Sequence, residues 1–149
     1  MTLSQTLRTL FERDIIRVKT EIESYKNEEN MWKLDGEILN SAGNLCLHLI
    51  GNLNHFIGAG IGKTGYVRKR ELEFSQKNIP REKLIKELED VVKVVDDSIK
   101  SLTEEELYAE TSVPKFTEKQ TTAFLLLHLH AHLNYHLGQI NYHRRLLDK

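Results

Sequence analysis

The sequence predicts an all-α protein, a bundle of four long helices that run up, down, down and up. Apolar residues recur at three-to-four spacing along four long stretches, and no stretch shows the strict alternation of a convincing strand. One link between these stretches is also long enough, at about twenty residues, to cross a bundle. With 149 residues and a mass of 17.3 kDa, the chain is predicted to form a single domain, residues 1–149, with a proper core.

The first predicted helix carries a stripe of apolar residues along one face. Thr2 and Ser4 are candidate caps for its start, because a hydroxyl can accept a hydrogen bond from the free backbone amides of the first turn. A short connection, residues 27–36, follows the helix. The stripe consists of Leu3, Leu7, Leu10, Ile15, Val18, Ile22 and Tyr25.

The second predicted helix runs from about residue 36 to 58, and a crossover follows it at residues 58–79. A crossover of this length makes the second and third helices parallel, whereas the shorter links elsewhere make neighbours antiparallel. The helices therefore run up, down, down and up, which sets the second helix antiparallel to the fourth.

The crossover opens with residues 58–64, Gly-Ala-Gly-Ile-Gly-Lys-Thr, which look like a phosphate-binding loop. The spacing is one residue too short for that motif, and the segment follows a helix where the motif requires a strand. We therefore reject a nucleotide site and interpret the glycines as a flexible exit from the second helix. Beyond them, Tyr66, Arg68 and Arg70 are candidate substrate contacts, because long loops often cover sites. The alternative is a solvated, charged strap pinned by Phe74.

The third and fourth predicted helices also have marked boundaries. Pro80 suits the first turn of the third helix. After a connection at residues 103–116, which contains Pro114, residues 117–120 (Thr-Glu-Lys-Gln) have the pattern of a capping box for a last helix over 118–147. The stripe of the third helix consists of Leu84, Leu88, Val91, Val95, Ile99 and Leu102.

Four of the seven histidines lie within nine residues of the last helix, at 128, 130, 132 and 136. Residues four apart on a helix stand about 6 Å from each other along its axis, so His132 and His136 can direct two imidazoles at one metal ion. The pair His128 and His132 can do the same, but one ion cannot take all three, because they span about 12 Å. His130 lies about 160° from His132 and is excluded. The alternative to a metal site is a polar seam between helices.

A catalytic metal needs a third protein ligand, and the second predicted helix offers His48 and His55. These two are seven residues apart, about 10.5 Å, so only one of them can join the ion. Antiparallel alignment of residues 36–58 with 118–147 places His48 between His132 and His136, and it places His55 opposite His128. The geometry therefore favours His48, while His55 and His128 are expected to form a polar lining.

Composition excludes several other classes of function. A formal net charge of −1, from 21 basic and 22 acidic residues, argues against a nucleic-acid interface. No window approaches 18 apolar residues and the first residues do not form a signal peptide, so we expect a cytoplasmic protein that does not enter the membrane. The single cysteine, Cys46, is expected to be buried and inert.

A resemblance to a known family rests on three parts of the chain. They are Trp32, the string from Asn40 to His48, and the segment from Thr121 to Ile140 with its H-x-x-x-H-x-G-Q-I pattern. Together with the helix order, the crossover and the length, they make nearly the whole chain similar to the DinB/YfiT-like superfamily of metalloenzymes. The resemblance implies an up-down-down-up four-helix bundle, often dimeric. It also implies that one histidine of the second helix and an H-x-x-x-H pair of the last helix bind a divalent metal. In this chain those positions are His48, His132 and His136.

The resemblance further implies a low-molecular-weight thiol, such as bacillithiol or mycothiol, as a cosubstrate. The metal is not distinguished, since Zn, Fe, Ni and Cu all suit three imidazoles. The expected function is therefore a metal-dependent thiol S-transferase, or a related hydrolase or isomerase, that acts on a small molecule. The alternatives are a non-catalytic metal-binding bundle and a structural homodimer that keeps its histidines as a polar core.

The roles of the surrounding residues follow less directly from the sequence. No carboxylate is placed by a recognisable motif to act as a base, so His128, His55 and Tyr66 are the candidates for proton transfer. Gln139, one turn beyond His136, is expected to orient a metal ligand or to occupy polar space between helices. Trp32 and the crossover are expected to cover the metal pocket.

Overall fold

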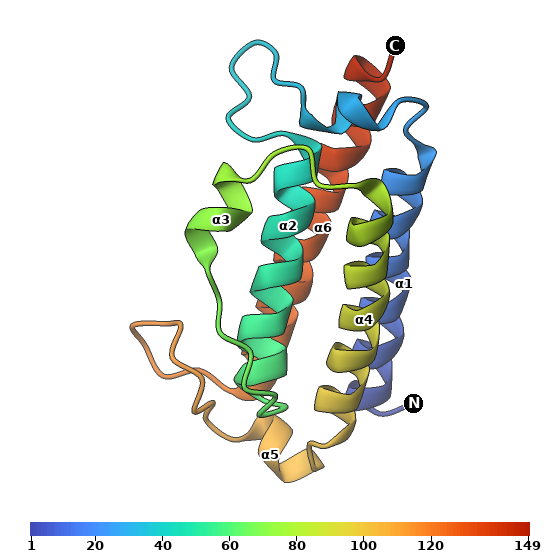
Figure 1. Cartoon of the computed structure of the whole chain (residues 1–149). Helices are drawn as coiled ribbons and strands as arrows, with labels where there is room; N and C mark the ends of the chain where they lie inside the picture. The colour runs from blue at the N-terminus through green and yellow to red at the C-terminus, as the bar shows by residue number, and fades with distance from the viewer.

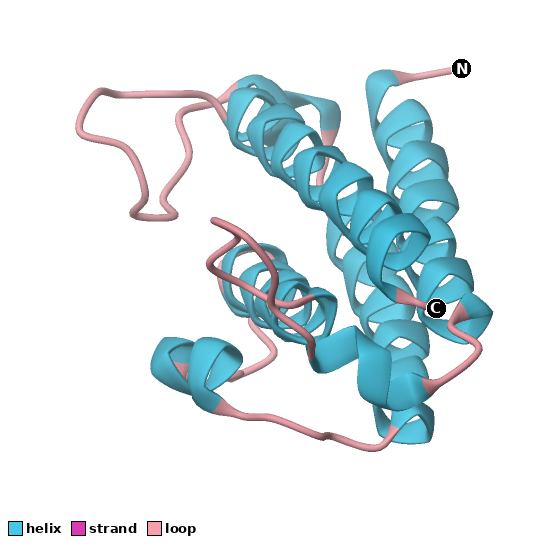
Figure 2. Ribbon diagram, turned by 90° about the horizontal axis from the view of Figure 1, so that it is seen from above, coloured by secondary structure: helices cyan, strands magenta, loops and turns pink.

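The computed structural model describes residues 1–149 and confirms the predicted all-α class. Four long helices lie side by side (Figure 1): α1 (Leu3–Ser24), α2 (Ala42–Leu53), α4 (Arg81–Lys100) and α6 (Thr122–Leu147). Helices α1 and α6 run in one direction, and α2 and α4 run in the other. Helices α1 and α2 each pack against both α4 and α6. A perpendicular view shows only helices and loops (Figure 2).

Short helical segments complete the structure. A 3-10 turn, η1 (Glu28–Trp32), follows α1, and a π-helical segment, η2 (Asn54–Ala59), continues α2. Helix α3 (Arg70–Ser75) lies within the crossover, and α5 (Glu104–Tyr108) precedes the last long connection. Neither α3 nor α5 was predicted, because a helix of five or six residues is too short to show a clear period.

The predicted apolar stripes form the core. Residues three or four apart share one helix face, so the stripes of α1 and α4 meet along their full length. The buried members of the two stripes are Leu7, Ile15, Val18 and Ile22 on α1, and Leu84, Leu88, Val91, Val95 and Ile99 on α4. Phe11, which the predicted stripe did not include, is buried with them.

Helix α2 differs from the others because all of its residues are buried. Helices α4 and α6 cover its inner side and α3 covers its outer side. Cys46 is among the buried residues, and burial raises the pKa of its thiol far above the usual value. An inert thiol, as predicted, is consistent with this environment.

The predicted start of the second helix, near residue 36, is wrong. Gly36 has a left-handed backbone with φ of +58°, and α2 begins at Ala42. The Ser41 hydroxyl caps it by accepting a hydrogen bond from the Asn44 amide at 3.2 Å. Residues 36–41 are therefore not helical and are available to line a cavity.

The glycines predicted as the exit from the second helix, in residues 58–64, do lie at its end, but they are closely packed. The backbone stays helical through Ala59, and the next glycines are tightly packed. A Cβ atom on Gly60 would lie 2.3 Å from the carbonyl oxygen of Phe56, and one on Gly62 would lie 2.2 Å from Oγ of Ser98 on α4. These glycines allow close packing of the chain against its neighbours.

The last helix begins at Thr122, four residues later than predicted. The backbone before it pairs with the segment after α5, through hydrogen bonds from Thr111 N to Gln120 O and from Thr122 N to Ala109 O. This pairing holds the backbone before α6 extended. The Thr121 hydroxyl therefore caps the helix by accepting a hydrogen bond from the Phe124 amide, and Thr117 does not cap it. None of the helices is both long enough and apolar enough to cross a membrane.

Candidate metal centre

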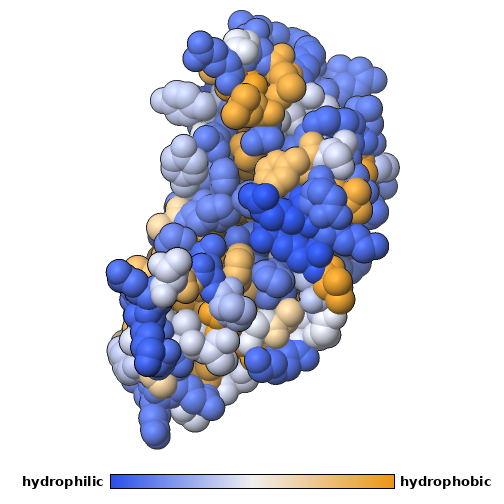
Figure 3. Space-filling view, turned by 90° about the vertical axis from the view of Figure 1, so that its left-hand side faces the viewer, coloured by the Kyte–Doolittle hydropathy of each residue, from blue (hydrophilic) through white to orange (hydrophobic).

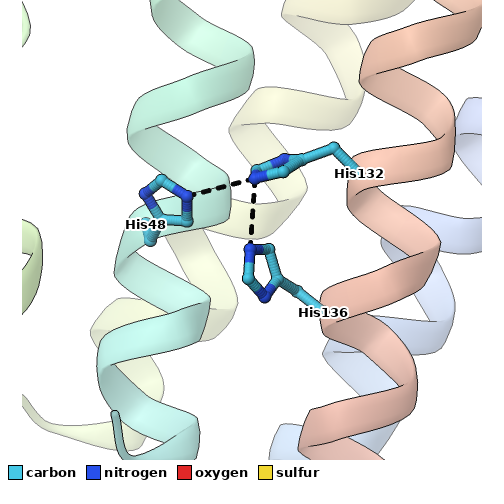
Figure 4. Close-up of side chains that lie close together, drawn as sticks. All are labelled: His48, His132 and His136. Carbon is cyan, nitrogen blue, oxygen red and sulfur yellow. Dashed lines mark hydrogen bonds between the residues drawn. The ribbon is translucent and has the colours of Figure 1, made fainter. Parts of the chain in front are cut away.

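Three histidine side chains from two antiparallel helices, α2 and α6, point at one place between these helices (Figure 4). Nε2 of His132 lies 3.2 Å from Nε2 of His48 and 3.1 Å from Nε2 of His136. His48 is buried, whereas His132 and His136 are half-buried. The structure thus brings the pair 132 and 136 together with His48 and leaves His128 apart.

A carboxylate contacts His48 at Nδ1, the ring nitrogen that does not face His132. Its Nδ1 lies 3.0 Å from Oε1 of Glu73, a buried residue of α3. Arg68 donates two hydrogen bonds of 2.9 Å to the same carboxylate, one from Nε and one from Nη2. A carboxylate oxygen can only accept, so Nδ1 of His48 donates in its contact with Glu73, and Nη2 of Arg68 lies 3.3 Å from the same Nδ1.

His136 is held by a different acceptor on its own helix. Its Nδ1 lies 2.7 Å from Oε1 of Gln139, one turn further along α6. The imidazole therefore donates from Nδ1, as His48 does, and keeps a lone pair on Nε2. Gln139 thus orients a candidate ligand, the first of the two roles expected for it.

Burial keeps all three imidazoles neutral near pH 7. It lowers the pKa of His48 despite the opposing effect of Glu73, and it lowers the pKa of His136 despite the hydrogen bond to Gln139. For His132, burial and then the neighbouring histidines lower the pKa to about 4. Neutral imidazoles keep the lone pairs that a metal ion requires.

The arrangement of protons favours a cation at the centre. The Nε2 lone pairs of His48 and His136 both point at Nε2 of His132, and a single N–H there could satisfy only one of them. Nδ1 of His132 is buried without a hydrogen-bond partner, so this nitrogen, unlike Nδ1 of the other two rings, has no acceptor. Three nitrogens about 2.0–2.1 Å from a tetrahedral ion would be about 3.3–3.4 Å apart, close to the two separations in this structure. The three residues therefore fit a divalent metal.

The second pair of histidines, His55 and His128, contacts aromatic rings. The His55 ring lies edge-on to Phe56 with 4.7 Å between centroids, and the His128 ring lies 5.1 Å from Phe116. Burial lowers the pKa of both imidazoles. No hydrogen bond joins the two imidazoles, so they form no direct pair, and their role as a polar lining stays a prediction.

The three crossover residues predicted to contact a substrate, Tyr66, Arg68 and Arg70, have different neighbours in the structure. Arg68 contacts Glu73, as described above, and Arg70 lies over the Phe74 ring at 5.1 Å. Phe74 in turn packs on the His48 ring, with 4.9 Å between centroids, so the crossover does cover this histidine. Tyr66 faces a separate cavity of about 340 Å³ between α2 and α3.

Trp32 packs at the start of α2 and does not line the cavity next to His136. A Cβ atom on Gly43 would lie 2.6 Å from the indole ring, so this glycine makes room for the tryptophan. No contact therefore supports the expectation that Trp32 covers the pocket. Asp35 and residues 37–40, from the connection after η1, line that cavity with His136.

The remaining histidines have structural partners away from the site. His130, on the opposite face of α6, lies 2.7 Å from the fully buried carboxylate of Asp14. His143 is buried, with Nδ1 2.6 Å from the Tyr25 hydroxyl and Nε2 2.8 Å from the backbone oxygen of Lys33. Both residues join helix α6 to segments early in the chain.

Sequence reasoning missed Glu73, the residue that holds His48. It is 25 residues from that histidine along the chain and belongs to a short helix that no periodicity revealed. The one available signal was Gly51, a glycine inside an apolar helical stretch, which can mark a close approach of another group.

A family model described as "Protein of unknown function (DUF1572)" matches residues 3–149. The chain belongs to this family. No curated protein matches the chain. For this DUF1572 protein, the three converging histidines are therefore the main guide to function.

Proposed function

We propose that this DUF1572 protein is a divalent-metal-dependent enzyme of the DinB type, with the metal held by His48, His132 and His136. The observation that carries the proposal is the convergence of three Nε2 atoms while the Nδ1 atoms of His48 and His136 are held by acceptors. Second partners of this kind fix the ring orientation and the tautomer of metal-binding histidines.

The arrangement of the helices supports the DinB assignment. The up, down, down, up order, the crossover between α2 and α4, and the origin of the three histidines on the second and last long helices all match that superfamily's pattern. We therefore assign the fold as a DinB-type four-helix bundle.

The set of candidate ligands supports catalysis over a purely structural metal. It contains three histidines and no carboxylate or cysteine, and the nearest carboxylate, Glu73, is engaged by His48 and Arg68. A site with three protein ligands leaves a position for a substrate, whereas structural sites are closed by a fourth ligand.

A divalent cation in this site would act as a Lewis acid and would lower the pKa of a thiol or water in its open position. Around it, Glu73 keeps the proton of His48 on Nδ1, and Gln139 does the same for His136. Because His132 and His136 are only half-buried, a small molecule can reach them from solvent. We propose a low-molecular-weight thiol as cosubstrate. It would lose its S–H proton on binding, and its thiolate would form a bond from sulfur to carbon of a small electrophile while the leaving group departs with the electron pair of the broken bond.

Helix α6 also supports assembly into a homodimer. It exposes large apolar side chains along one side, with Ala131 and Gly138 between them, and small residues allow two helices to approach closely. We propose that a second copy packs on this side, which sedimentation equilibrium would test. The exposed residues are Phe124, Leu127, Tyr135 and Tyr142.

The metal and its open position can be tested together. Freshly purified protein is expected to contain about one divalent metal per chain, and the cobalt-substituted form is expected to change its visible spectrum and release a proton when a small thiol is added. A metal-free protein that cannot be loaded would contradict the metal site. A loaded cobalt form whose spectrum no thiol changes would favour the non-catalytic alternative.

A further inference from the structure

A cavity of about 620 Å³ lies between the start of α2, the connection after η1 and the last turns of α6. On the face that carries α3, apolar residues gather at the upper end and strongly hydrophilic ones form a band across the middle (Figure 3). The apolar side chains that line the cavity are Ile38, Leu39, Leu45, Tyr142, Leu146 and Leu147.

The cavity begins at the candidate metal centre. His136 itself lines it, as does Gln139, which accepts the hydrogen bond from Nδ1 of this histidine. On the facing helix, Leu45 lies about one turn before His48 and lines the same cavity. A molecule in this cavity would therefore touch the ring of one candidate ligand and lie within about one helical turn of the other two.

The walls have the character of a small-molecule site. Large apolar side chains are exposed around a concave surface, with 87% of Leu39, 61% of Leu146 and 44% of Ile38 accessible. The volume falls within the range of about 300–1,000 Å³ that is usual for such pockets. Covering these side chains with an apolar group would remove them from water, which is favourable.

We propose that this cavity binds an uncharged aromatic or alkyl group of the small molecule on which the metal site acts. This inference rests on the proposed function, which identifies the metal as the reacting centre. It adds the class of substrate, a compound with an apolar body attached to the group that reaches the metal. Because the cavity lies next to His136, a substrate whose apolar body fills it would have its reactive end toward the three histidines.

Two thiols with the same metal-binding group test the proposal. We would titrate the cobalt-substituted protein with 2-mercaptoethanol and with 4-phenylbutane-1-thiol and follow the visible spectrum. The phenylbutyl compound is expected to bind at least about tenfold more tightly, because its apolar tail can be buried. Equal affinities for the two thiols would overturn the proposal.

A matched pair of variants locates the binding of the tail. Ile38 and Leu34 are both exposed apolar residues of the same connection, but only Ile38 lines the cavity. Ile38→Asn should weaken 4-phenylbutane-1-thiol at least about threefold and leave 2-mercaptoethanol unchanged, whereas Leu34→Asn should change neither. An equal loss in both variants would show that the tail binds elsewhere and would refute the assignment.

A third measurement separates this proposal from the metal chemistry. Calorimetry with 4-phenylbutan-1-ol, which lacks the thiol, requires no metal. Binding to the wild type that weakens in Ile38→Asn but not in Leu34→Asn would support the cavity even if the cobalt form gave no thiol response. Absence of binding to the wild type, with a normal thiol response, would overturn the cavity proposal and leave the proposed function intact.

Discussion

Gly51 of α2 and Glu73 of α3 share one small space: a Cβ atom at position 51 would lie 1.8 Å from Oε2 of Glu73. The carboxylate can pass over α2 and reach His48 because residue 51 has no side chain. A glycine inside a helix costs about 0.5–1 kcal/mol relative to alanine, so its presence here is explained by the contact that it allows.

We predict that Gly51→Ala weakens metal binding although it changes none of the three histidines. The new methyl group would displace Glu73 from His48, and loss of such a partner typically lowers metal affinity by about 10–100-fold. Competition with a chelator would measure the affinity.

Gly138→Ala provides the matched control for this variant. A Cβ atom there, also on a long helix and close to His136, would meet no atom within 4 Å. This control should keep its metal affinity, because the added methyl group displaces nothing that supports the three histidines. Equal metal affinities in Gly51→Ala and Gly138→Ala would show that Glu73 does not support the site.

We predict that alanine at His48, His132 or His136 abolishes or strongly weakens the binding of one metal per chain. Each substitution removes one of three nitrogens that converge within 4.8 Å. Metal content after dialysis, measured by atomic emission, would test this. His130→Ala should retain its metal, because His130 faces Asp14 on the other side of α6. If His130→Ala loses the metal as completely as His136→Ala, the assignment of helix faces is wrong.

We predict that Glu73→Gln lowers metal affinity by about tenfold or more while the protein stays folded. The amide has nearly the same shape as the carboxylate, but it lacks the negative charge that holds the Nδ1 proton of His48 and pairs with Arg68. Glu71→Gln, on the exposed side of the same short helix, is the control and should bind metal normally. Circular dichroism would verify folding in both variants, and an unchanged affinity in Glu73→Gln would refute the supporting role.

We predict that Asp14 makes the stability of the protein depend on pH in the acid range. Burial alone would raise the pKa of this carboxyl, but hydrogen bonds from Arg13, Asn134 and His130 overcome burial and lower its pKa to about 2. A carboxyl with a depressed pKa in the folded state stabilises above its unfolded pKa, near 3.8, and that contribution is lost as the pH falls toward 2.

Urea unfolding of the wild type and Asp14→Asn at pH 7 and pH 3 would test this dependence. The free energy difference between the two proteins is expected to be about 2 kcal/mol at pH 7 and to shrink by about 1 kcal/mol at pH 3. A difference that is the same at both pH values would mean that the charge of Asp14 contributes nothing to stability.

The sequence by itself determined the helical class, the core stripes and the histidines that could meet. The three-to-four period of residues such as Ile15, Val18 and Ile22 depends only on local geometry, and so does the four-residue spacing of His132 and His136. The choice of His48 over His55 needed one further step, the antiparallel register of two helices. The structure brings together the three histidines that this register favoured.

The tertiary structure alone decided what surrounds those histidines. Glu73 reaches His48 because α3 folds back over α2, and Thr121 rather than Thr117 caps α6 because residues 109–111 pair with the preceding backbone. The cavity next to His136 forms because residues 36–41 are not helical, contrary to the sequence prediction. Each of these features depends on contacts between segments that are far apart in the chain. Local periodicity carries no information about such contacts, so only the packed molecule could reveal them.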